Sequence, residues 1–64
     1  MQPFQQRVVD EKKALEDKLL KLKTFCENST FSELDTDECN RLERQMFYME
    51  GYVEVLDERI TAFK

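Results

Sequence analysis

An apolar ladder with helical spacing runs through the second half of the sequence. Its members follow one another at steps of three and four residues: Cys39, Leu42, Met46, Met49, Val53, Leu56, Ile60 and Phe63. This is the heptad spacing of a helix that packs along its whole length against other helices. A second column on the neighbouring face is too aromatic for a solvent-facing surface and too polar for a core: Arg41, Gln45, Tyr48, Tyr52, Val55 and Arg59. A functional surface is to be sought in this second column.

The first half of the sequence predicts a helix over residues 3–26. Pro3 suits a first helical turn, because the N–H that proline lacks would have no intrahelical partner there. The apolar positions then recur at helical spacing: Phe4, Val8, Leu15, Leu19, Leu22 and Phe25 or Cys26, widened by Val9 and Leu20. Glu11 and Lys12 interrupt this stripe. They predict either a charged pair that reaches solvent or the floor of a polar site.

Residues 27–35 read as the loop between two helices, because the composition turns polar there: Asn28, Ser29, Thr30 and Ser32. Phe31 and Leu34 are expected to fold back over the closed end of the hairpin. Asp35, followed three residues later by Glu38, predicts a capping box, with Leu34 placed as a hydrophobic staple. Thr36 is the alternative cap. The second helix is predicted over residues 36–63.

Two long helices joined by a short loop lie antiparallel, so the fold class is all-α, a two-helix hairpin in one domain of residues 1–64. A chain of this length buries only about 60% of its unfolded surface. The hairpin would leave an apolar patch in water: Val9, Leu20, Phe47, Tyr48, Tyr52 and Val55. Such a patch predicts a homo-oligomeric helical bundle, with a dimer the simplest form and larger closed rings also open. Gly51, inside the second helix, fits either a close approach of another backbone or ligand, or a tolerated glycine.

Composition narrows the class of function. Fourteen acidic against ten basic residues give a net charge of −4, which argues against DNA or RNA polymers but leaves room for a small anion in a local basic pocket. No stretch approaches the roughly 18 apolar residues of a membrane span, and there is no signal-peptide core, so a cytoplasmic protein is expected.

Catalysis and metal binding are not expected from this composition. With two cysteines and no histidine, a common four-ligand zinc site within one chain is excluded. Cys26 and Cys39 could form a disulfide at the closed end of the hairpin, and the missing secretion signal favours two thiols. There is no glycine-rich phosphate loop or nucleophile motif, so neither an enzyme nor a cofactor is expected.

Cations and aromatic rings at helical spacing point to binding. Guanidinium and ammonium groups pair with phosphate, and aromatic rings stack on bases. One group lies on contiguous faces of the second helix: Arg41, Arg44, Tyr48, Tyr52 and Arg59. A second group lies near the start of the first helix, which an antiparallel hairpin brings toward Tyr52 and Arg59: Arg7, Lys12 and Lys13. The same residue types are also enriched in protein interfaces, so a plain oligomer contact stays open.

The chain also resembles a known family over most of residues 6–63. The matching stretches are Gln6 to Lys13, Leu15, Lys18-Leu19, Lys21-Leu22, Arg41-Leu42, Arg44-Gln45, Met49, Tyr52, Val55-Leu56, Glu58 to Ile60 and Ala62-Phe63. They resemble the helical-hairpin domain of the phage anti-CBASS and anti-Thoeris sponges. The resemblance implies compact oligomers, commonly hexamers, whose pockets between protomers enclose cyclic nucleotide messengers in the cytoplasm of the host bacterium. It also implies immune evasion by sequestration and not by cleavage.

Carried onto this chain, the resemblance implies a phosphate ligand at Lys13, with Lys12 the alternative, and an arginine at Arg41 or Arg44. The stacking aromatic of the family lies ahead of its first helix, where this chain is short. Phe4, or Tyr52 from another copy, would replace it. Sequestration of a cyclic di- or trinucleotide is the leading functional hypothesis. The alternative is a structural or protein-binding hairpin that docks through its aromatic face.

Overall fold

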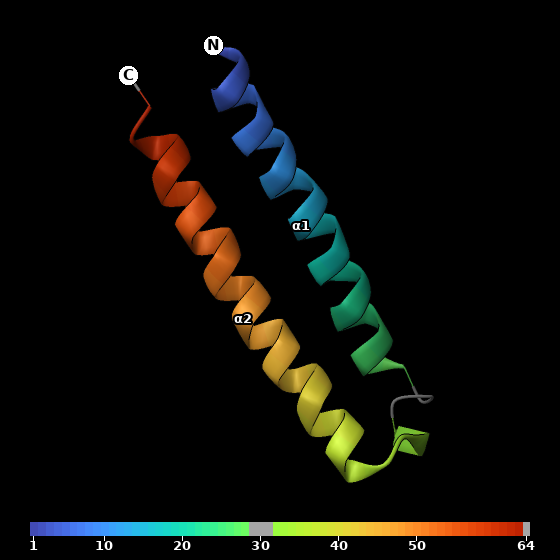
Figure 1. Cartoon of the computed structure of the whole chain (residues 1–64). Coiled ribbons are helices and arrows are strands. Elements are labelled where there is room, and N and C mark those ends of the chain that lie inside the picture. The colour runs from blue at the N-terminus through green and yellow to red at the C-terminus, as the bar shows by residue number, and fades with distance from the viewer. Residues whose placement is uncertain (29–31, 64) are drawn as a thin grey trace.

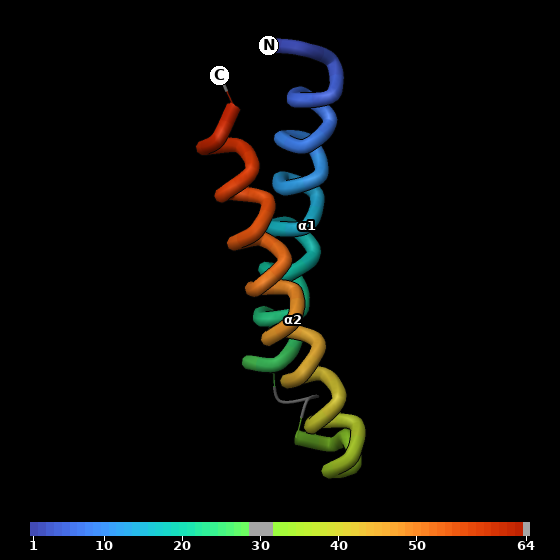
Figure 2. The backbone as a smooth tube through the Cα atoms, turned by 60° about the vertical axis from the view of Figure 1, so that its left-hand side comes forward, coloured from blue at the N-terminus to red at the C-terminus, as the bar shows by residue number. Residues whose placement is uncertain are grey.

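The computed structural model describes residues 1–28 and 32–63. Two helices, α1 (Pro3–Glu27) and α2 (Thr36–Thr61), form an antiparallel hairpin with both termini at the same end (Figure 1). The molecule is a rod of 47 × 15 × 13 Å. In a second view the helices remain side by side along their length (Figure 2). The all-α hairpin predicted from the heptad ladder is confirmed.

The start of α1 is fixed by a glutamine that the sequence analysis did not single out. Pro3 is the first helical residue, as expected. The side-chain oxygen of Gln5 accepts a hydrogen bond of 2.8 Å from the backbone N–H of Gln2. Gln5 is also the one polar residue that is buried among those described. It therefore closes the helix end and fills the seam beside it.

The start of α2 follows the predicted cap. The Asp35 carboxylate accepts a hydrogen bond of 2.8 Å from the backbone N–H of Glu38, and Thr36, the alternative cap, is the first helical residue. Leu34, the predicted staple residue, is half-buried, and the Cys39 thiol lies 3.9 Å from the Leu34 carbonyl oxygen. Phe31 lies outside the described residues. At the other end α2 stops at Thr61, two residues before the predicted end, and the Phe63 ring packs edge-on against Phe4.

The core is a narrow seam between the two helices. Leu56 is only 1% exposed, and Val8 and Leu19 of α1 are the other buried apolar residues among those described. Every other member of the α2 ladder is half-buried. A second helix covers only one side of its neighbour, so this seam excludes water along its centre and not at its edges.

Polar contacts across the seam give the hairpin two distinguishable sides. On one side the Tyr52 hydroxyl donates a hydrogen bond to Glu11. On the other, Lys12 pairs with Asp57 at 2.8 Å and Lys23 pairs with Glu50 at 3.2 Å. Tyr52 and Asp57 are five residues apart on α2, about 140° around the helix, and buried Leu56 lies between them. We call these the groove side, marked by Tyr52 and Glu11, and the ion-pair side.

Candidate functional site

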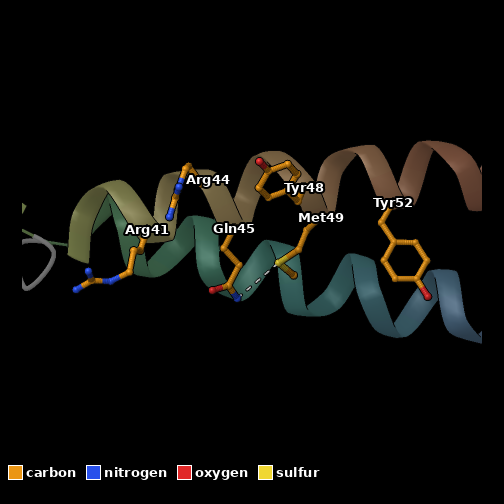
Figure 3. Close-up of a pocket in the computed structure, with 6 residues that line it drawn as sticks. All are labelled: Arg41, Arg44, Gln45, Tyr48, Met49 and Tyr52. Carbon is orange, nitrogen blue, oxygen red and sulfur yellow. Dashed lines mark hydrogen bonds between the residues drawn. The ribbon is translucent and has the colours of Figure 1, made fainter. Parts of the chain in front are cut away.

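An open groove lies along α2 on the groove side of the hairpin. It has a volume of about 540 Å³, and six residues of α2 line it: Arg41, Arg44, Gln45, Tyr48, Met49 and Tyr52 (Figure 3). Their spacing of three and four residues brings all six onto one broad face of the helix. The size is within the range of small-molecule sites. We refer to it as the α2 groove.

The loop end of the α2 groove carries two guanidinium groups. Arg41 Nε donates to Glu38 Oε1 at 2.8 Å, and this hydrogen bond raises the pKa of Arg41. Among the described residues, Arg44 forms no ion pair, so its guanidinium is available to an incoming anion. Between the arginines and the tyrosines, Gln45 Nε2 approaches Met49 Sδ at 3.9 Å (Figure 3). An anionic ligand would find its strongest unoccupied donor at Arg44.

The opposite end of the α2 groove is aromatic. Tyr48 is 68% exposed and packs edge-on against Phe47, with ring centroids 5.7 Å apart. Tyr52 is 47% exposed. Its hydrogen bond to Glu11 is the largest cause that raises the pKa of Tyr52, whereas nearby Arg59 acts in the opposite direction. The two exposed rings offer flat surfaces on which a base can stack.

Four of the nine residues predicted for the site line the α2 groove: Arg41, Arg44, Tyr48 and Tyr52. Arg7 precedes Glu11 by four residues and Arg59 follows Tyr52 by seven, so both share the groove side beyond the end of the groove. The structure therefore brings the arginine and tyrosine part of the predicted cluster onto one side of the hairpin.

The other three predicted residues lie elsewhere within one chain. Lys12 pairs with Asp57 on the ion-pair side, and its hydrogen bond to Asp57 raises the pKa of Lys12. Lys13 follows Glu11 by two residues, about 200° around α1, and so projects away from the groove side. Phe4 packs on Phe63 at the end that carries the termini. Lys12 and Lys13 do not approach Tyr52 from the groove side of the same chain.

Three residues of the groove side were not predicted for the site. Gln45 and Met49 stood in the two columns of α2 but were not assigned to a site, and the groove needs both. Lys18 follows Glu11 by seven residues and therefore shares its face of α1. The heptad relation to Glu11 is a signal that could have found Lys18, once Glu11 is known to face Tyr52.

A second, smaller groove adjoins the first on the outer surface of α2. Its volume is about 430 Å³, and its lining is Phe47, Tyr48, Glu50, Gly51 and Glu54. A Cβ atom added to Gly51 would meet nothing within 4 Å, so no neighbour within the described chain requires a glycine there. Tyr48 belongs to both grooves and forms the ridge between them.

Residues 1–28 and 32–63 contain no cluster of three or more cysteine or carboxylate ligands. Neither helix is long and apolar enough to cross a membrane, judged on these same residues. Cys26 and Cys39 are present as thiols. Burial, reinforced by Glu43, raises the pKa of the Cys26 thiol and so disfavours its reactive thiolate form.

These features define a helical hairpin whose chemistry-bearing residues form an open basic and aromatic groove, the arrangement of a binding protein. The Sequestin family model matches residues 2–62, and the chain belongs to the Sequestin family. The name describes sequestration, which fits both the groove and the resemblance to the phage nucleotide sponges, and it suggests a role without catalysis. Neither the curated proteins nor the solved structures that were compared gave a match.

Proposed function

We propose that this protein binds cyclic di- or trinucleotide messengers and sequesters them without cleaving them, as a phage protein that evades bacterial immunity in the host cytoplasm. One observation carries the proposal: Arg41 and Arg44 share a single groove with Tyr48 and Tyr52. Guanidinium groups bind phosphate and tyrosine rings stack on bases, so the α2 groove offers both halves of a nucleotide. Membership of the Sequestin family supports the proposal.

The net charge of −4 is compatible with an anionic ligand because charge is unevenly distributed. On the groove side, Arg41 compensates the charge of Glu38, whereas Glu11 accepts a hydrogen bond from the neutral hydroxyl of Tyr52. Arg44 has no ion-pair partner among the described residues. The local potential that a ligand meets depends on these few neighbours and not on the total charge.

Self-association is part of the same proposal. One helix alone lines the α2 groove, which leaves it open, whereas small-molecule sites bury most of the surface of their ligand. A second copy packed over the exposed aromatic face would supply the missing wall. The resemblance to the sponges points to homo-oligomers, among them hexamers. The ligand would then lie between protomers.

Calorimetric titration tests the proposal with cyclic dinucleotides of adenosine and guanosine and with cyclic triadenylate. We expect at least one ligand to bind at micromolar or tighter affinity, and Arg44→Ala to weaken it about tenfold or more because a charge-assisted hydrogen bond is lost. Lys21→Ala is the matched control, since Lys21 pairs with Asp17 at 3.0 Å within α1. Absence of binding across the panel would refute the proposal.

A protein-docking function is the rival, favoured by the exposed Phe47 and Tyr48 rings, 71% and 68% accessible. Under that reading Phe47→Ala abolishes capture of the partner protein, and Arg44→Ala leaves it intact. If the protein is a sponge, Arg44→Ala instead weakens binding of the nucleotide. Ligand binding through phosphate also weakens as salt concentration rises, whereas docking through aromatic rings is much less sensitive.

A further inference from the structure

We infer that Lys18 is the α1 cation of the α2 groove and binds a second phosphate of the ligand, separate from the phosphate held at Arg44. This assignment rests on the proposed function and goes beyond it. It concerns which residue of α1 takes part, where the resemblance pointed to Lys13 or Lys12. Lys18 meets three requirements: it lies on the groove side of α1, it stands beside the groove, and its ammonium group is available.

The side follows from the contact between the helices. Glu11 accepts a hydrogen bond from Tyr52, so the face of α1 that carries Glu11 borders the groove side. Lys18 follows Glu11 by seven residues, only about 20° away around the helix. Lys13 is about 200° away from Glu11. Of these two lysines, Lys18 therefore shares the side of the groove.

The position along the hairpin also fits. Seven residues place Lys18 about 10 Å from Glu11 toward the loop. The α2 groove extends in the same direction from Tyr52 to Arg41, about 16 Å along α2. The Lys23 to Glu50 ion pair lies farther along α1 than Lys18. Lys18 therefore stands beside the middle of the groove, across the seam from the tyrosines.

Availability also favours Lys18 among the lysines of α1. Three of its lysines are engaged: Lys12 with Asp57, Lys21 with Asp17 and Lys23 with Glu50. Among the described residues, Lys18 is exposed and forms no ion pair. Its flexible four-carbon stem lets the ammonium group reach toward the groove without a change in the backbone.

Lys18 belongs to α1, whereas Arg44 belongs to α2 and lines the groove. A phosphate at Arg44 sits over the outer surface of α2, and a phosphate at Lys18 sits toward α1. A ligand with two separated phosphates and bases that stack on Tyr48 and Tyr52 would engage both cations at once. The arrangement of charges therefore favours a nucleotide ligand with two separated phosphates.

The test is calorimetry with whichever ligand of the cyclic nucleotide panel binds the wild-type protein most tightly. We expect Lys18→Ala to weaken binding about tenfold, Lys18→Arg to keep most of the affinity, and Lys13→Ala to stay within about twofold of wild type. Circular dichroism and light scattering check that fold and mass are unchanged. A loss at Lys13→Ala with none at Lys18→Ala would overturn the assignment.

A double-mutant cycle with Arg44→Ala tests for two phosphates. If Lys18 and Arg44 hold separate phosphates, the fold-losses multiply to within about twofold in the double variant. If both residues hold one phosphate, the double variant loses clearly less than the product, and the two-phosphate inference fails. Wild-type protein that binds no panel member refutes the proposed function itself. If the wild-type protein binds a ligand and Lys18→Ala binds it equally well, only this inference is refuted.

Discussion

Tyr52 has two roles in the hairpin. Its ring is part of the α2 groove, and its hydroxyl joins the two helices through Glu11. The hydrogen bond also gives the Glu11 carboxylate beside the groove a polar partner, while the neutral hydroxyl leaves the negative charge of Glu11 in place. A residue chosen from the sequence as a ligand contact is thus also a tertiary contact.

Tyr52→Phe should lower stability at neutral pH because the hydrogen bond to Glu11 is lost. The pKa of Tyr52 is raised above its ordinary value near 10. The stability that this hydroxyl confers is therefore complete below about pH 10 and is lost as the pH rises through the higher folded-state value. Melting curves of wild type and variant should differ at pH 7 to 9 and converge as the pH rises above that value.

Tyr48→Phe is the control, because the Tyr48 ring packs on Phe47 and no hydrogen bond of its hydroxyl occurs among the described residues. At neutral pH it should lower stability less than Tyr52→Phe does. A difference between wild type and Tyr52→Phe that persists unchanged at high pH would contradict the role assigned to the Tyr52 hydroxyl.

At the element scale, α2 combines a strong start with a weak point in its middle. The Asp35 cap satisfies a backbone N–H at the first turn. Gly51, sixteen residues later, lowers helix propensity, and no neighbour among the described residues excludes a side chain there. Exposed Phe47 and Tyr48 lie one turn before it. Within a single hairpin, packing gives no reason for glycine at this position.

Gly51→Ala should stabilise the dilute hairpin by about 0.5–1 kcal/mol, since alanine restricts the unfolded chain and its Cβ meets open space. Urea unfolding followed by circular dichroism measures the change. Ala14→Gly, at an exposed position of α1, is the matched reverse substitution and should cost a similar amount. A destabilising Gly51→Ala that appears only at high protein concentration would reveal a second chain packed against Gly51.

The whole molecule is a thin rod with too little interior to be self-sufficient. Its buried apolar residues, among those described, are Val8, Leu19 and Leu56. Large apolar side chains remain exposed on both helices, including Leu20, Phe47, Tyr48 and Val55. A chain this short is marginal on its own, and association of copies is a common way to bury further surface.

If copies associate, the thermal midpoint should rise with protein concentration, because an assembly that binds only folded chains shifts the equilibrium by mass action. Melting at concentrations that differ by ~100-fold provides the measurement. Phe47→Ser should weaken this dependence, whereas Lys21→Ala should preserve it. Identical midpoints at all concentrations, together with a monomer mass in light scattering, would contradict self-association.

The two helices, the Asp35 cap and the seam could be predicted from the sequence, because heptad spacing and capping chemistry are local properties of the chain. The same spacing places Arg41, Arg44, Tyr48 and Tyr52 on neighbouring faces of one helix. The side of α1 that each of those faces meets depends instead on how the helices pack. Glu11 and Lys12 are adjacent in sequence, yet they point about 100° apart and contact Tyr52 and Asp57 on opposite sides of the seam. The rotation of α1 against α2 fixes that choice, and periodicity within one helix carries no information about it.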